Sequence, residues 1–235
     1  MYELLVAPTP HEAAAAAAHR TAVAIEEARR ARGVAHLSLA GGSTPRVMYE
    51  LLAPLLVHPE GLHLWFGDER AVPPDDEESN FRMVSESLLA VAEISAERVH
   101  RILGERPAPE AAEIYADELG RAVARNADGV PVLDLAFLGL GEDGHTASLF
   151  PGDPMIGVPG SLVRAVSAPK PPPDRVTLTL DVLRAARRVI VLATGGGKRE
   201  AVCAVLRGPD PAVPASLLPS AVTTLIVDAA AAPRV

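Results

Sequence analysis

Apolar and polar residues follow two patterns along this chain, and each pattern predicts one kind of element. Segments with apolar residues on one face predict helices, the first of which should begin at Thr9-Pro10 and end before Gly33. Because strands, glycine turns and helices alternate, the sequence predicts an α/β protein built on a parallel sheet. Short apolar runs predict strands at 3–6, 34–40, 62–66, 99–102, 135–138, 162–166, 176–180, 189–193 and 225–227. The segments between them predict helices at 10–32, 45–56, from 79 onward, 107–126, 146–150, and from the glycines at 195–197 as far as 206.

Composition narrows the class of protein. With 235 residues, 49% of them hydrophobic, the chain can bury one substantial core, so we expect a single domain over 1–235. The formal charge of -8 argues against nucleic-acid binding, which normally needs a basic face, and any anionic ligand must be held by local cations. One cysteine, Cys203, excludes an internal disulfide. No signal peptide and no apolar run of membrane-spanning length are evident, so we expect a cytoplasmic protein without a membrane partner.

The loop after the apolar run at 135–138 carries the strongest chemical signal. It contains three glycines and the triplet Asp143-Gly144-His145, and ligands of open α/β sheets bind at such carboxyl ends of strands. The glycines also fit G-x-G-x-x-G, but Pro151 cuts the following helix short and the next acid, Asp153, comes too early for a dinucleotide site. The alternative without a function is that His145 is an ordinary loop histidine that is hydrogen-bonded only to the backbone. Its carboxylate neighbour among glycines favours a functional role.

Two further strand ends have the composition of anion sites. The turn at 41–45, with Gly42, Ser43 and Thr44, precedes a helix whose free N–H groups favour an anion, although a tight turn with a capping serine is an equal alternative. Lys198 follows three glycines. This segment is not a nucleotide P-loop, because the first glycine is missing and Arg199 follows the lysine, but the lysine still suits a phosphate.

Taken together, these segments resemble a known family. The motifs AGGSTP, WFGDER, Ser79-Asn80, GLGEDGHTASLFPG, Arg175-Val176-Thr177 and GGGK occur in this order over most of the chain and are similar to those of the 6-phosphogluconolactonases of the pentose phosphate pathway. The fold of that family is similar to that of glucosamine-6-phosphate isomerase/deaminase. The resemblance implies a modified doubly wound, Rossmann-like, mostly parallel sheet with helices on both faces, and hydrolysis of 6-phospho-D-glucono-1,5-lactone.

The resemblance also implies roles for individual residues. It makes His145 the catalytic acid/base and Asp68 its partner, with Arg70 in the same site. The substrate phosphate would be held by Gly42, Ser43, Thr44, Arg175 and Lys198, with Asn80 and Arg82 in support.

The chemistry of a δ-lactone is compatible with this set of residues. The lactone is an activated ester, so water and a neutral base such as His145 suffice, while Asp68 or Asp143 orients the ring. Arg70 or loop N–H groups would face the oxyanion. Ser148 lacks the setting of a nucleophile, and no histidines form a ligand-spaced cluster, so we expect neither metal nor cofactor. The partner is a small sugar-phosphate lactone, and the protein itself is expected to be a monomer or a small homo-oligomer.

Two alternatives remain at this stage. An aldose-ketose isomerase/deaminase needs a further acid after the D-G-H triplet, where this chain has Phe150, and its relatives have tyrosine at the position of Arg70. A sugar-phosphate-sensing module would not require His145 and Asp68. Such a module usually follows a DNA-binding segment, for which we expect no room ahead of the strand at 3–6.

Overall fold

The computed structural model describes residues 1–234, which contain a six-stranded sheet in the order β1-β9-β8-β5-β2-β3. Every neighbouring pair of these strands is parallel. The fold is therefore the predicted doubly wound parallel sheet. Its strands are β1 (Glu3–Ala7), β2 (Ala35–Leu39), β3 (Leu62–Phe66), β5 (Leu135–Gly139), β8 (Val189–Ala193) and β9 (Thr223–Asp228).

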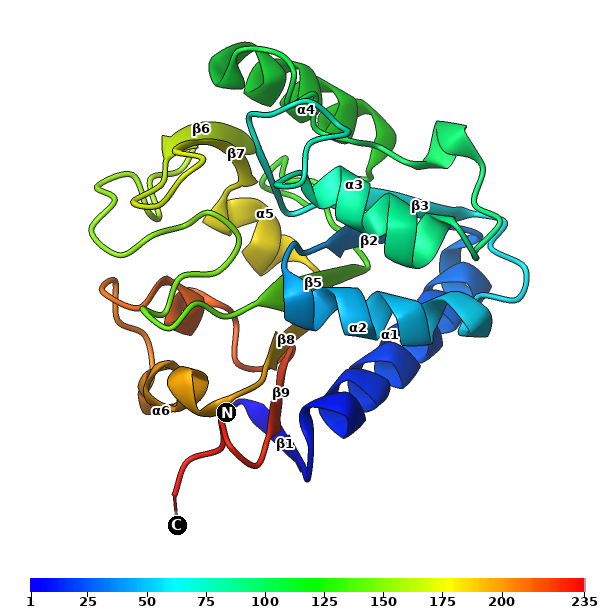
Figure 1. Cartoon of the computed structure of the whole chain (residues 1–235). Helices are drawn as coiled ribbons and strands as arrows, with labels where there is room; N and C mark the ends of the chain where they lie inside the picture. Colours follow the sequence, from blue (N-terminus) through cyan, green and yellow to red (C-terminus); the bar gives the residue numbers. More distant parts are fainter. Residues whose placement is uncertain (235) are drawn as a thin grey trace.

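Helices cover both faces of the sheet. α1 (Pro10–Arg32) and α2 (Ser43–Leu52) lie on one face, while α5 (Leu180–Ala185) and α6 (Arg199–Arg207) lie on the other (Figure 1). α1 begins and ends as its sequence predicts: the Thr9 side chain accepts the Glu12 N–H, and Gly33 takes the left-handed conformation at φ 77°. Its buried face is mostly alanine at helical spacing, which lets the helix backbone approach the strands closely.

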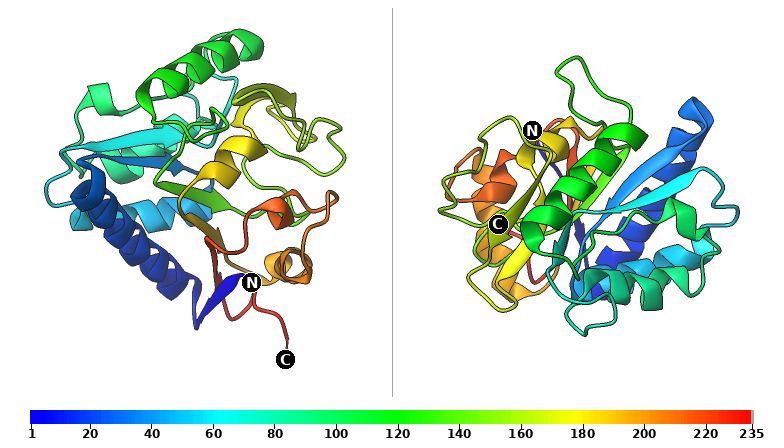
Figure 2. Two further views of the ribbon diagram at one scale, coloured as in Figure 1. Left: turned by 180° about the vertical axis from the view of Figure 1, so that it is seen from behind. Right: turned by 90° about the horizontal axis from the view of Figure 1, so that it is seen from above.

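A second, antiparallel sheet was not predicted. It has three strands in the order β4-β7-β6, namely β4 (Asp68–Arg70), β7 (Asp174–Leu178) and β6 (Val163–Ser167), and α4 (Ala108–Ala122) packs against it (Figure 2). The chain passes from β3 of the large sheet into β4 of the small sheet at Gly67. The GDER segment, read from sequence as the end of a strand, is therefore a short strand of its own, since it pairs with residues about 100 positions away.

Other expected elements differ in detail. The strand expected at 99–102 is reduced to a single bridge between Leu64 and Val99. The helix expected at 146–150 is absent, because Ala147 has φ 47° and Thr146 pairs with Leu149. α5 was not predicted, and the helix expected at 107–126 ends at Ala122. The remaining helical segments are α3 (Asn80–Val84), a π-turn (Ser85–Leu89) and 3-10 turns at Ala53–Leu55, Ala96–Arg98, Gly196–Lys198 and Pro214–Leu217.

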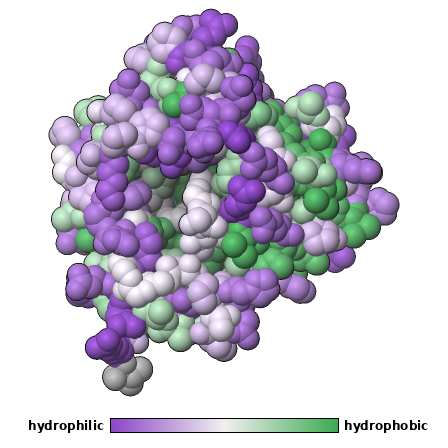
Figure 3. Space-filling view, in the orientation of Figure 1, coloured by the Kyte–Doolittle hydropathy of each residue, from purple (hydrophilic) through white to green (hydrophobic). Residues whose placement is uncertain are grey.

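The order of the strands fixes the place of a site. From β2 the chain adds β3 on one side, while β5, β8 and β9 are added on the other, so the winding reverses between β2 and β5. Ligands of open α/β sheets bind at the carboxyl ends of the strands at such a switch point. The surface is hollowed near its centre, close to where α2 begins (Figure 3). No helix within residues 1–234 is long and apolar enough to cross a membrane.

Candidate active site

A cavity of about 290 Å³ lies at this switch point. Its walls come from the carboxyl ends of three adjacent strands, β2, β5 and β8, together with β4 and β7 of the small sheet. The prediction that the loops at the strand ends meet in one place is thus confirmed. Of the predicted site residues, Gly42, Ser43, Thr44, Asp68, Arg70, His145, Arg175 and Lys198 line the cavity.

His145 is held by the carboxylate two residues before it. Asp143 Oδ1 lies 2.5 Å from the His145 ring Nδ1 and also accepts the His145 backbone N–H at 3.1 Å. The turn between them depends on Gly144, which has φ 86°. Partial burial opposes ionisation of Asp143, but the backbone and ring hydrogen bonds from His145 outweigh it and lower the pKa of this carboxyl. Asp143 itself lies behind the ring, outside the cavity lining.

Gly141 packs directly against this pair. A side-chain Cβ at position 141 would lie 2.0 Å from His145 Nδ1 and 2.5 Å from Asp143 Oδ1, so only glycine fits while the imidazole is in this position. The other side of the ring meets Phe150, at 4.8 Å between ring centroids. The imidazole is therefore fixed on two sides, with its second nitrogen left for the cavity.

The family resemblance implied Asp68 as the partner of His145, and the chemistry left Asp68 and Asp143 as alternatives; in this structure the ring is hydrogen-bonded to Asp143 and not to Asp68. Asp68 Oδ2 accepts the Ser148 hydroxyl at 2.5 Å, and Asn80 Nδ2 lies 3.4 Å from Oδ1 and donates to the Asp68 carbonyl at 2.9 Å. A local turn brings Asp143 to the ring, whereas Asp68 belongs to β4. Asp68 is 7% exposed and still lines the cavity, so it contributes a buried carboxylate separate from the Asp143–His145 pair.

Three cations face the cavity. Arg175 is nearly buried, with its Nε donating to the Pro172 carbonyl at 3.1 Å, and burial together with the nearby Arg70 charge lowers its pKa. Arg70 Nη1 donates to the backbone and side chain of Glu78, while its buried Nε has no acceptor within residues 1–234. Lys198 ends the 3-10 turn after β8. Two guanidinium groups and an ammonium on one small cavity favour an anionic ligand.

The glycine turn after β2 forms another wall. Gly42, at φ 108°, stands immediately before α2, and Ser43 is the first helical residue rather than a side-chain cap, so the plain reading as a serine-capped turn is wrong. Thr44 Oγ1 lies 3.1 Å from Thr194 Oγ1, which joins this turn to the end of β8. A Cβ at Gly41 would lie 1.8 Å from Asn80 Oδ1, so this backbone also packs tightly against α3.

Two charged residues near the cavity differ from what the sequence indicated. Glu69, 2% exposed, accepts the backbone N–H groups of Arg70, Asn80 and Phe81, and so fixes the start of α3 beside β4. Arg82, expected in a supporting role, is turned to Glu86 and the Asp75 carbonyl and does not line the cavity. The sequence shows a glutamate after Asp68, but it does not show that this side chain is buried or that it accepts the N–H groups at the start of α3. Within residues 1–234 no three His, Cys, Asp or Glu side chains are grouped so as to hold a metal ion.

Comparison with known proteins agrees with the geometry. Residues 8–227 match the profile of the family described as glucosamine-6-phosphate isomerases/6-phosphogluconolactonase. The chain belongs to this family. It is 46% identical over 169 residues to 6-phosphogluconolactonase from Homo sapiens, a match that covers 69% of this chain and 64%, just under two thirds, of that protein. It is 38% identical over 210 residues to 6-phosphogluconolactonase from Mycobacterium tuberculosis, covering 86% of this chain and 85% of that protein.

Solved structures of this family have the same architecture. The structure of 6-phosphogluconolactonase from Trypanosoma brucei is similar with a TM-score of 0.88 and 31% identity, covering 98% of this chain and 97% of that one. A monomeric glucosamine-6-phosphate deaminase is similar with a TM-score of 0.81 at 22% identity, which shows a shared fold alone. The predicted fold class is confirmed.

Proposed function

We propose that this chain hydrolyses 6-phospho-D-glucono-1,5-lactone to 6-phospho-D-gluconate, the lactonase step of the pentose phosphate pathway. The observation that carries the proposal is the Asp143–His145 pair at the wall of a small cavity that three cations also line. The 6-phosphogluconolactonases among the relatives support the same activity. Because the formal charge of the whole chain is -8, an anionic substrate must be bound by these local cations, and the same charge argues against a nucleic-acid partner.

In the proposed mechanism His145 acts as a general base. Its Nδ1–H donates to Asp143, so the neutral ring presents Nε2 to a water molecule in the cavity. His145 takes one proton from this water while the water oxygen forms a bond to the lactone carbonyl carbon. The imidazolium is stabilised by Asp143 and then returns the proton to the ring oxygen as the carbonyl carbon–ring oxygen bond breaks. Base catalysis of this kind contributes about 10²- to 10⁴-fold.

The cations of the cavity would stabilise the negative charge that develops on the substrate and would bind its phosphate. We assign Arg70, whose buried Nε has no acceptor within residues 1–234, to the oxyanion that forms on the lactone carbonyl. Arg175, Lys198 and the turn from Gly42 to Thr44 would hold the phosphate at the other end of the substrate. Asp68, fixed by Ser148 and Asn80, is left to accept a sugar hydroxyl.

The aldose-ketose isomerase/deaminase alternative is less well supported by the site. Moving a proton between adjacent carbons and protonating a departing amine requires a further acid close to the histidine. In this chain the aromatic ring of Phe150 occupies that neighbourhood, 4.8 Å from the His145 ring between centroids. A phenyl ring neither accepts nor donates a proton, so this site favours water attack on a lactone.

The test offers two substrates to one preparation. Purified protein is mixed with freshly generated 6-phosphogluconolactone, and acid release is compared with the spontaneous rate, while ammonia is followed in parallel with glucosamine 6-phosphate. We expect rapid lactone hydrolysis, no ammonia, and a kcat at least about 100-fold lower in His145→Ala. Lactone loss no faster than in buffer, with ammonia release that depends on His145, would overturn the proposal.

A further inference from the structure

The turn that carries Lys198 is held from behind by a buried carboxylate. Asp228, the last residue of β9, is 2% exposed, and its Oδ1 accepts the Gly195 backbone N–H at 3.0 Å and the Ala231 N–H at 2.9 Å. No lysine, arginine or histidine pairs with it within the described chain. One buried oxygen therefore joins the first residue of the Gly195–Lys198 turn to the segment that follows β9.

That following segment is itself fixed to the same turn. Arg199, the residue after Lys198, donates from Nε to the Ala232 carbonyl at 3.0 Å and from Nη2 to the Ala230 carbonyl at 2.6 Å. Asp228, which is bonded to Gly195 ahead of the lysine, and Arg199, which follows the lysine, thus bind the same stretch of backbone, 230–232. On the other side, a Cβ at Gly197 would lie 2.5 Å from Glu142 Oε1, so the turn is also packed against the loop that carries His145.

These contacts matter because the turn has little rigidity of its own. It consists of three consecutive glycines, and Gly195 has φ 93°. Glycine loses more conformational freedom on ordering than any other residue, so such a turn needs outside contacts to hold one geometry. A lysine ammonium binds phosphate as a point charge, and its contribution depends on where the backbone places it.

We infer that Asp228 is a positioning residue for substrate phosphate, acting through Gly195 to hold Lys198 at the cavity. This inference rests on the proposed lactonase function. Asp228 does not touch the cavity, since the lining on this side ends at Thr194 and Lys198. Its role is therefore to fix the backbone, and the hydrogen-bond acceptor, not the negative charge, is the required property.

Steady-state kinetics on two substrates test the inference. Asp228→Ala should raise KM for 6-phosphogluconolactone by about tenfold or more with kcat within about threefold, while kcat/KM for unphosphorylated gluconolactone stays within about twofold. Asp228→Asn keeps an acceptor oxygen and should restore KM to within about threefold of wild type. The matched control is Asp134→Ala. Asp134 is also a buried carboxylate that accepts a backbone N–H, at His36, but at the opposite end of the strands, so its loss should lower Tm without changing KM.

The possible outcomes separate the two proposals. A wild-type chain without lactonase activity refutes the function, whereas an active wild type with an unchanged KM in Asp228→Ala refutes only the role of Asp228. Equal losses on both substrates, or an Asp228→Asn variant as impaired as Asp228→Ala, would also overturn it. If Asp228→Ala does not fold, Arg199→Ala serves instead: a KM increase of about threefold for the phosphorylated lactone alone supports the inference, and a wild-type KM overturns it.

Discussion

Acid should destabilise this protein through one buried histidine, His36, at the amino-terminal end of β2. Its Nδ1 accepts the indole N–H of Trp65 at 3.1 Å, and its backbone N–H donates to Asp134. An indole nitrogen can only donate, so a proton on His36 Nδ1 would place two N–H groups against each other. Burial, together with the charges of the neighbouring histidines, lowers the pKa of His36 from 6.5 to about 4.

The expected magnitude follows from linkage. Between pH 6.5 and pH 4 the unfolded state binds more protons at this site than the folded state, so the contribution of His36 to stability is complete above pH 6.5 and falls as the pH drops toward 4. Each unit of pKa difference corresponds to about 1.4 kcal/mol, which gives a limit of about 3 kcal/mol for the full shift. From pH 7 to pH 5 the loss should be about 2 kcal/mol, or about 4 to 8 °C in Tm.

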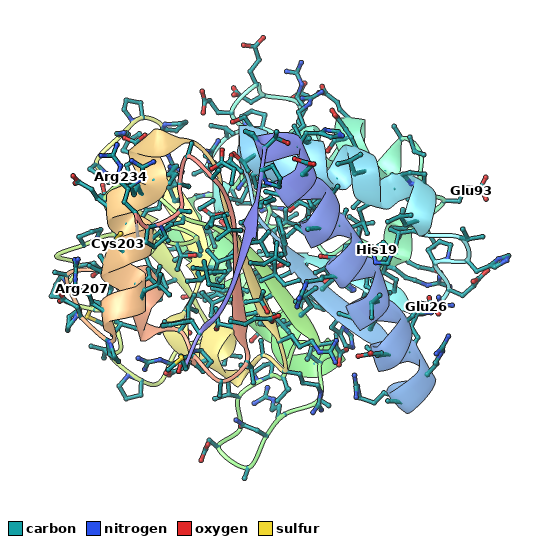
Figure 4. The ribbon with its side chains drawn as sticks, turned by 90° about the horizontal axis from the view of Figure 1, so that it is seen from below. His19, Glu26, Glu93, Cys203, Arg207 and Arg234 are labelled. Carbon is teal, nitrogen blue, oxygen red and sulfur yellow. The ribbon has the colours of Figure 1, made fainter. Side chains whose placement is uncertain are left out.

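Trp65 provides an intrinsic fluorescence probe of unfolding, because it is the only tryptophan of the chain. It lies in the same cluster of rings, stacked on His100 at 3.9 Å between ring centroids. Urea unfolding followed by tryptophan fluorescence at pH 7 and pH 5 gives the free energy of unfolding directly. His36→Asn keeps an acceptor for the indole but does not titrate, so its loss between the two pH values should be smaller by about 2 kcal/mol. His19→Asn is the matched control, since His19 projects from the exposed side of α1 (Figure 4). Equal losses in wild type and His36→Asn would refute the reasoning.

Three further outcomes test the site. Gly141→Ala should lower kcat by at least about 100-fold, because the added Cβ would displace the His145 ring from a position 2.0 Å away, and near wild-type kcat would mean that the ring is not needed there. Arg175→Ala should raise KM for the phosphorylated lactone by about tenfold or more, and an unchanged KM would place the phosphate elsewhere. Exhaustive chelation should leave activity intact, which a loss restored by a divalent ion would contradict.

The sequence predicts the position of the site better than its internal pairing. Strand-end loops converge because parallel strands share one carboxyl edge, so the pattern of apolar runs alone brings His145, Lys198 and the turn at Gly42 together. The partner of His145 depends on a turn of two residues. The D-G-H triplet contained that information, but the family resemblance pointed to Asp68, which β4 holds for a different set of donors.

What the sequence does not predict are contacts between distant segments with no periodicity of their own. β4 has only three residues, and its pairing with β7 joins Asp68 to Thr177. The acceptors at Glu69 and Asp228 bind backbone N–H groups, which every non-proline residue carries, so nothing in their sequence neighbourhood identifies their partners. The expected helix at 146–150 fails because local propensity is overridden by the turn that aims Ser148 at Asp68.

The passage of the chain from one sheet to the other at Gly67 gives a bound substrate a mechanical role. Asp68, Arg70 and Arg175 belong to the small sheet, whereas His145 and Lys198 follow strands of the large one, so a ligand in the cavity bridges two separately hydrogen-bonded layers. Local opening of the small sheet would dismantle the binding site before the large sheet unfolds. Product bound between the two sheets should therefore slow amide hydrogen exchange in β4, β6 and β7 more than in β1 and β9, so that binding can be detected as increased rigidity of the whole small sheet.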